Sequence, residues 1–144
     1  MTDHAPSQDA RYELGVRTMY QLGGQTVTDE FLEALSGVCP ALGEHIVSTI
    51  YGELYQRPEL SPAERGLTTL VVLATLGDCE REIRLHAKVA LNAGLSPARI
   101  IETMFQIAPY AGVPRALNAV LVLREIFNEM NLLPVVADRG RPAS

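Results

Sequence analysis

The sequence predicts an all-α protein, a bundle of about six to seven helices, and three observations support this fold class. Apolar residues recur every three or four positions, as at Leu67, Leu70 and Val71, which is the spacing of a buried helix face. Helix stop and start signals stand between such stretches, for example Gly94 and then Ser96-Pro97. No segment alternates strictly enough between polar and apolar residues to predict a β-strand.

The expected helices follow one another with short connections. In chain order they span about 9–22, 29–37, 40–55, 62–76, 79–93, 97–110 and 114–130. Ser61-Pro62-Ala63-Glu64 gives the fourth helix a capping box with proline at its first position. Pro109 and Gly112 break the helical pattern between the last two helices.

The last expected helix is apolar around much of its circumference. Its apolar residues are Leu117, Val120, Leu121, Val122, Leu123, Ile126 and Phe127. One face cannot bury all of them, so we expect part of this surface to meet another copy of the chain in a homo-oligomer.

Length and composition predict one helical domain over 9–132, between a flexible N-terminus (1–8) and a C-terminal tail (133–144). No apolar run reaches the roughly 20 residues that span a bilayer, and the first residues lack the layout of a signal peptide, so we expect a cytoplasmic protein that does not contact membranes. The net charge of -5 and the scattered Lys and Arg argue against a nucleic acid partner.

The cysteines and histidines predict no metal site. Cys39 and Cys79 are too few for a disulfide scaffold or a closed zinc site, and we expect both to be reduced and buried. The three histidines, at positions 4, 45 and 86, lack the spacing of metal ligands. The sequence also contains no Gly-rich phosphate loop and no defensible Ser/His/Asp arrangement.

The segment from Cys79 to His86 is the strongest candidate for chemistry. At helical spacing it places the thiol of Cys79, the carboxylate of Glu82 and the imidazole of His86 on one face. His86 has two interpretations: a core histidine bonded to a carbonyl, or a functional acid or hydrogen-bond donor. In the second, Glu82 fixes the tautomer of His86 and raises its pKa.

A second candidate region ends the third expected helix. Tyr51 and Tyr55 are spaced at i and i+4, and Arg57 precedes Pro58. This stretch is either the end of an amphipathic helix or a pocket wall, in which the rings pack on a flat substrate and Arg57 binds a carboxylate. Likewise, the segment around Tyr110 is either a tight turn or a place where the backbone approaches a ligand.

Several short blocks, in this order and spacing, resemble the carboxymuconolactone decarboxylases, which share a fold superfamily with the alkylhydroperoxidase AhpD proteins. The resemblance runs from Arg11 to about Phe127. The matching blocks are 11–15, 51–58, 65–70, 82–86, 90–95 and 110–114. The resemblance implies an AhpD-like helical subunit in a trimer or hexamer, with active sites near subunit contacts.

The departures from the family pattern bear on the chemistry. In the AhpD branch a reactive thiol pair occupies the positions of Cys79 and Glu82, so a peroxidase that recycles through an internal disulfide is not expected here. Tyr51 and Tyr55 replace tryptophans, and Arg115 stands where the pattern has a small residue. Because these residues are expected to line the pocket, the departures leave open a substrate other than the muconolactone of aromatic catabolism.

The leading hypothesis is a cofactor-free decarboxylase that acts on a small carboxylated lactone or a related activated carboxylic acid. His86 is the expected donor or acid and Glu82 its orienting partner. The expected substrate contacts are Arg57, Tyr55, Tyr51, Arg65, Tyr110 and Arg115. Two alternatives remain: an AhpD-like thiol-dependent peroxidase that uses Cys79, and a non-catalytic helical oligomer.

Overall fold

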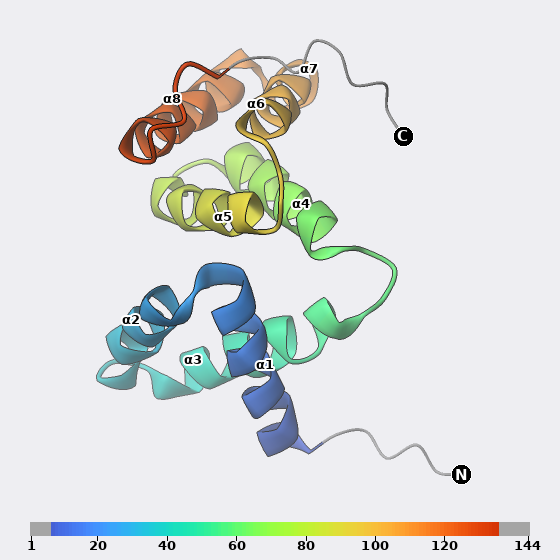
Figure 1. Cartoon of the computed structure of the whole chain (residues 1–144), viewed down its shortest axis with the longest axis vertical. Helices are drawn as coiled ribbons and strands as arrows, with labels where there is room; N and C mark the ends of the chain where they lie inside the picture. Colours follow the sequence, from blue (N-terminus) through green and yellow to red (C-terminus); the bar gives the residue numbers. More distant parts are fainter. Residues whose placement is uncertain (1–6, 136–144) are drawn as a thin grey trace. The chain divides into compact units, whose positions relative to one another are not determined.

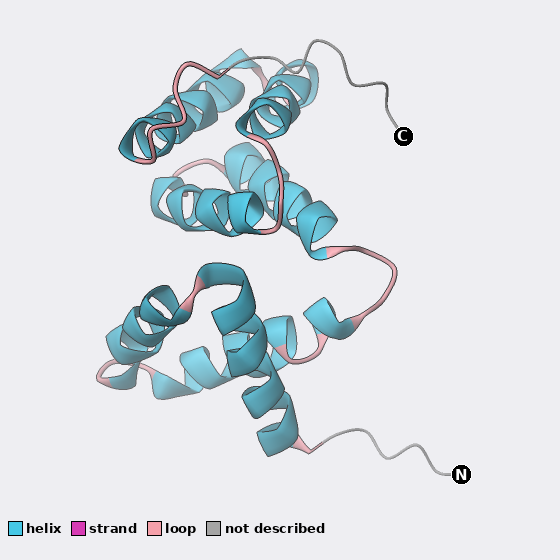
Figure 2. Cartoon of the chain, viewed as in Figure 1, coloured by secondary structure: helices cyan, strands magenta, loops and turns pink. Residues whose placement is uncertain are grey.

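The computed structural model describes residues 7–135, which form helices joined by short loops (Figures 1 and 2). These residues contain no β-strand, which confirms the all-α prediction. The chain divides into two compact units, one ending at Ser61 and the other beginning at Pro62. The single domain over 9–132 stays a prediction, and most of the two expected flexible ends lies outside the described residues.

The first unit consists of three α-helices and two short helices of other types. They are α1 (Gln8–Gly23), α2 (Gln25–Ser36), α3 (Pro40–His45), the π-helix η1 (Ile46–Tyr51) and the 3-10 helix η2 (Leu54–Gln56). Helix α1 packs closely on η1. A Cβ at Gly15 would overlap the carbonyl oxygen of Val47, so only glycine permits this approach.

Two expected helices of this unit differ from the structure. The helix predicted at 40–55 is three short helices, because the N–H of Gly52 bonds to the carbonyl of Val47 at 2.8 Å in an i to i+5 pattern. Helix α2 begins four residues before its predicted start, because Gly24, at φ +84°, follows α1 and caps α2 without an intervening loop.

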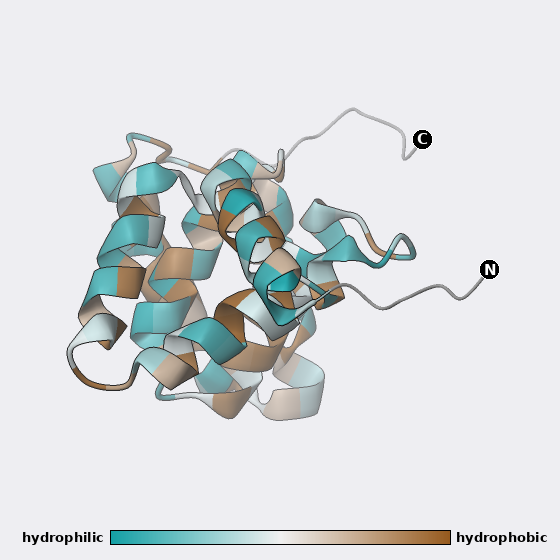
Figure 3. Cartoon of the chain, turned by 90° about the horizontal axis from the view of Figure 1, so that it is seen from below, coloured by the Kyte–Doolittle hydropathy of each residue, from teal (hydrophilic) through white to brown (hydrophobic). Residues whose placement is uncertain are grey.

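The second unit is built from five α-helices. They are α4 (Pro62–Leu76), α5 (Glu80–Asn92), α6 (Pro97–Gln106), α7 (Ala108–Ala111) and α8 (Val113–Glu129). Helix α8 contacts each of the other four, and α4 also packs on α5. The largest fully buried residues of this unit are Leu70, Ile100, Met104, Leu123, Ile126 and Phe127. They come from α4, α6 and α8, and Figure 3 shows the corresponding mixture of apolar and polar stretches along the helices.

The start and stop signals of this unit act largely as the sequence predicts. Helix α4 has the predicted bounds, Gly94 adopts φ +92°, and the Ser96 hydroxyl accepts a hydrogen bond from the N–H of Arg99 at 3.3 Å. The helix predicted at 97–110 is instead two helices, α6 and α7, which meet at Ile107. Pro109 explains the break, since its ring would clash with the carbonyl four residues earlier in a continuous helix.

The surface of the described chain carries both exposed leucines and an exposed cysteine. Helix α8 buries Leu123 and Phe127 but leaves Leu117 and Leu121 half exposed, at 52% and 48%. Cys39 is exposed, so the prediction that it is buried is wrong: it caps α3 at a turn on the surface rather than lying on a core face. Within residues 7–135, no helix combines the length and apolar character needed to cross a membrane.

Candidate functional site

Helix α5 carries the strongest candidate residues of the second unit. Cys79 is its N-cap, and Glu82 and His86 follow at spacings that keep all three on one helical face. Glu82 is exposed and His86 is partly buried. The Nδ1 atom of His86 is buried and has no hydrogen-bond partner among the described residues. The predicted face therefore exists, and it includes a buried ring nitrogen without a hydrogen-bond partner in this part of the chain.

The protonation of His86 differs from the expectation. Burial lowers the pKa of His86 below 6.5, and the negative charge of Glu82 acts in the opposite direction without reversing this. The expected upward influence of Glu82 is present, but burial outweighs it. The imidazole is therefore neutral at pH 7, in which form it carries one N–H donor and one free nitrogen.

Ion pairs and close packing hold α5 in place. Arg84, on the polar side of the helix, pairs with Glu125 at 3.0 Å and also with Glu129, both from α8. On the other side, a Cβ at Gly66 of α4 would lie 3.4 Å from the Cβ of Ala90. These contacts fix the rotation of α5, and with it the direction in which His86 faces.

The other candidates in this unit lie in different environments. Arg65, in the first turn of α4, is only 8% exposed. Arg115, in the first turn of α8, lies against Gly77 at the turn between α4 and α5. Tyr110, in α7, is 84% exposed and free of the core. Arg115 is thus placed near the start of α5, whereas Tyr110 projects from the unit.

The first unit holds the remaining candidates. The rings of Tyr51 and Tyr55 stack with their centroids 5.1 Å apart and an interplanar angle of 30°. Burial, with a smaller effect of Tyr55, raises the pKa of Tyr51 to about 12, so its hydroxyl stays protonated and can donate. The Gln56 side chain donates to the Tyr51 carbonyl at 2.8 Å and holds this corner together. Arg57, which follows η2, is exposed and extended, as expected before a proline.

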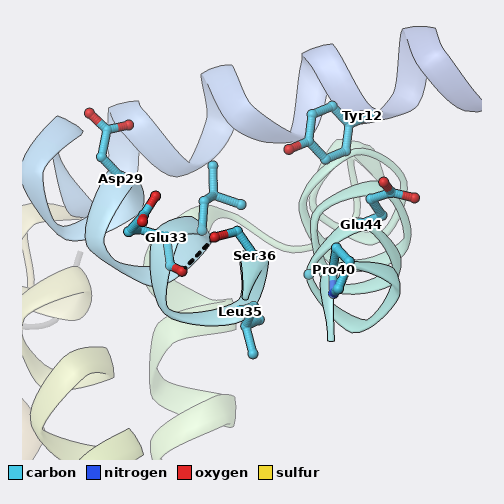
Figure 4. Close-up of a pocket in the computed structure, with 9 residues that line it drawn as sticks. Tyr12, Asp29, Glu33, Leu35, Ser36, Pro40 and Glu44 are labelled. Carbon is cyan, nitrogen blue, oxygen red and sulfur yellow. Dashed lines mark hydrogen bonds between the residues drawn. The ribbon is translucent and has the colours of Figure 1, made fainter. Parts of the chain in front are cut away.

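A pocket of about 370 Å³ in the first unit lies between α1, α2 and α3 (Figure 4). Its nine lining residues include Asp29, Glu33 and Glu44 but no lysine or arginine. None of the predicted site residues lines it. The charge of this pocket repels an organic acid, and sequence patterns could not indicate the pocket because its walls come from three separate helices.

The described residues show no group of three or more His, Cys, Asp and Glu side chains that could hold a metal ion.

The amino-acid sequence is similar to one protein family and to several known proteins. The sequence profile of the carboxymuconolactone decarboxylase family matches residues 40–125. A 4-carboxymuconolactone decarboxylase from Acinetobacter baylyi is 27% identical over 128 residues, which cover 89% of this chain and 95% of that protein. A nitrosuccinic acid decarboxylase from Metarhizium robertsii is 32% identical over 88 residues, 60% of each chain. An uncharacterised 15.0 kDa protein from Paracoccus denitrificans is 24% identical over 99 residues, which cover 68% of this chain and 74% of that protein.

Proposed function

Because the chain belongs to the carboxymuconolactone decarboxylase family, we propose that it is a cofactor-free decarboxylase acting on a small carboxylated lactone or a related activated carboxylic acid. The observation that carries the proposal is the similarity to a 4-carboxymuconolactone decarboxylase along almost the whole length of both chains. The similarity to a nitrosuccinic acid decarboxylase supports the same reaction type on a different small acid.

The chemistry makes limited demands on the protein. The C–C bond to the carboxylate breaks, CO2 leaves, and the electron pair moves into an adjacent lactone carbonyl or a similar electron-withdrawing group. The resulting enolate then takes a proton on carbon. The substrate is its own electron sink, so the protein has to supply a donor to the developing oxyanion, a cation for a second carboxylate and a source of the proton.

His86 is the proposed donor to the oxyanion. Its lowered pKa keeps the ring neutral at pH 7, and a neutral imidazole can donate its N–H without first being protonated. The same lowering disfavours the alternative role of general acid, which requires the imidazolium. Glu82, one helical turn earlier, is the proposed partner that orients the ring.

The cations are assigned by their position. Arg115 and Arg65 belong to the same unit as His86, and they are the proposed contacts for carboxylate groups of the substrate. The roles of Tyr51, Tyr55 and Arg57 as substrate contacts, and of Tyr110, stay predictions.

The assembled form is a further part of the proposal. Val113, Leu117 and Leu121 follow one another at intervals of four along α8 and are all exposed, so they form an apolar stripe. Burying such a stripe against a second copy is the ordinary way to remove it from water. We propose a homo-oligomer, a trimer or a hexamer, in which α8 contributes to the contact.

The test is the release of CO2 from 4-carboxymuconolactone and from nitrosuccinate by the purified protein after dialysis against a chelator. We expect stoichiometric CO2 from at least one of them, with Cys79→Ser retaining activity within a few fold of wild type. No CO2 from either acid, together with thiol-dependent peroxide reduction that Cys79→Ser abolishes, would replace the decarboxylase with the peroxidase alternative.

A further inference from the structure

The turn that joins α4 to α5 has an unusual backbone. Gly77 has φ +75° and Asp78 has φ +55°, so two consecutive residues adopt the left-handed region. The N–H of Gly77 donates to the carbonyl oxygen of Leu73 at 3.0 Å and closes α4. Helix closure alone therefore explains a glycine at position 77.

Arg115 gives Gly77 a second role. A Cβ at Gly77 would overlap Nη1 and Cζ of Arg115 and would lie 3.2 Å from its Nε. The guanidinium occupies the space that any other side chain at position 77 would fill. The absence of a side chain at Gly77 is thus what allows Arg115 to lie on this turn.

The guanidinium of Arg115 makes no ion pair within the described part of the chain. No hydrogen bond or ion pair joins the side chain of Arg115 to another residue of 7–135, whereas Arg84, which also contacts α8, pairs with two glutamates. The N-caps of α5 and α8, Cys79 and Gly112, provide no side-chain hydrogen bond to their helices. The guanidinium therefore lies on the turn between the negative end of α4 and the positive end of α5.

The turn that Arg115 contacts lies at the start of α5, the helix that carries His86. The start of the helix lies about 10 Å from His86 by the helical rise. The imidazole leans toward the N-terminus of its helix, as side chains on α-helices do, which shortens this gap. An acid with anionic groups at both ends is therefore the class of ligand that would contact both His86 and Arg115.

We propose that Gly77 is a positioning residue, which holds the guanidinium of Arg115 at the start of α5 as the contact for a second anionic group of the substrate. The pair selects dianionic acids over monoanionic ones. This inference rests on the proposed decarboxylase function. The competing role for Arg115 is structural, because a cation beside the C-terminal end of α4 also stabilises that helix.

The first experiment tests the positioning without using activity. Gly94 has the same left-handed conformation as Gly77, at φ +92°, but a Cβ there would meet nothing within 4 Å, so Gly94→Ala is the matched control. We expect Gly77→Ala to melt about 5–10 °C below Gly94→Ala, because the new Cβ displaces the guanidinium. Adding Arg115→Ala to Gly77→Ala should remove the difference. Equal melting of the two glycine variants, or a difference that survives without Arg115, overturns the positioning role.

The second experiment separates substrate contact from helix stabilisation. With whichever of 4-carboxymuconolactone and nitrosuccinate the wild type accepts, Arg115→Ala and Gly77→Ala should raise KM roughly 10- to 100-fold while kcat stays within a few fold, since a charge-assisted contact to a spectator group is lost. Arg115→Lys should recover part of the loss. An unchanged KM in variants that melt at lower temperature assigns Arg115 the structural role and overturns the proposal.

The third experiment tests whether Arg115 binds a second anionic group, and it does so even if the proposed function fails. Succinate should raise the melting temperature of the wild type but not that of Arg115→Ala, whereas propionate, with one carboxylate, should act equally on both. If the wild type releases no CO2 from either test acid, the proposed function fails, and the succinate result still tests the contact at Arg115. An equal response of both proteins to succinate overturns it.

Discussion

His86 carries the proposed chemistry, and its protonation state also contributes to stability. The folded protein lowers the pKa of His86 from 6.5, because burial disfavours the charged ring. The unfolded chain then binds a proton more readily than the folded chain below that pH. The stability that this group contributes is complete above pH 6.5 and is lost as the pH falls through the folded pKa.

We therefore expect the free energy of unfolding to decline from pH 7 to pH 5, and His86→Gln to reduce that decline. Urea unfolding at a series of pH values measures this decline in unfolding free energy. His45→Gln, at an exposed position, is the matched control and should keep the wild-type decline. An unchanged decline in His86→Gln would mean that the imidazole is not protected by burial.

The raised pKa of Tyr51 leads to a corresponding prediction for stability at alkaline pH. Burial raises its pKa from 10.0 to about 12, so stability from this group is present below pH 10 and is lost as the pH rises through 12. The wild type should therefore lose about 2 kcal/mol of unfolding free energy between pH 10 and pH 12 through this group, and Tyr51→Phe should lack that loss. Unfolding measured at both pH values checks this, and Tyr55→Phe serves as the comparison. If both variants keep the full alkaline loss, Tyr51 titrates like an exposed tyrosine.

Among the elements, the crossing of α1 and η1 is the tightest contact in the first unit. The carbonyl of Val47 lies where a Cβ of residue 15 would be, so Gly15→Ala forces the two helices apart. We expect a loss of about 3 kcal/mol in unfolding free energy. Gly37→Ala is the control, since a Cβ there meets nothing within 4 Å and the backbone has φ -88°. A small effect at Gly15, equal to that at Gly37, would show that the two helices do not pack so tightly at their crossing.

Local signals predicted some elements well and others poorly. Helix α4 has the predicted bounds, and it begins at Pro62, a start signal that depends only on neighbouring residues. The third expected helix was not predicted correctly, because its π-turn coincides with packing on α1 through Gly15 and Gly52. Such a contact joins residues distant in sequence, and periodicity carries no information about it.

The same distinction holds for the candidate site. The spacing of Glu82 and His86 on one helix could be predicted, because it depends only on helical geometry. The direction of the His86 pKa could not, because burial of the ring depends on the rest of the fold. Nor could the contact of Arg115 with Gly77, whose residues come from different helices.

The apolar stripe on α8, formed by Val113, Leu117 and Leu121, predicts self-association of the protein. An obligate interface typically buries about 2,000 Å² or more, and a stripe of exposed leucines is suited to it. Light scattering should show a trimer or hexamer for the wild type, and Leu117→Glu combined with Leu121→Glu should reduce its mass. Asn128→Glu, near the other end of α8, should leave the mass unchanged. A wild type that is monomeric at micromolar concentration would contradict the prediction.

In the proposed mechanism, the assembled protein decarboxylates a small acid with His86 as the donor to the oxyanion. The most direct measurement compares kcat for CO2 release by wild type and His86→Ala, on whichever of 4-carboxymuconolactone and nitrosuccinate the wild type accepts. A single preorganised donor contributes roughly 10²- to 10³-fold, so kcat should fall by about that factor while melting temperature and assembly stay close to wild type. Full activity in a folded, normally assembled His86→Ala would show that His86 is not the donor to the oxyanion.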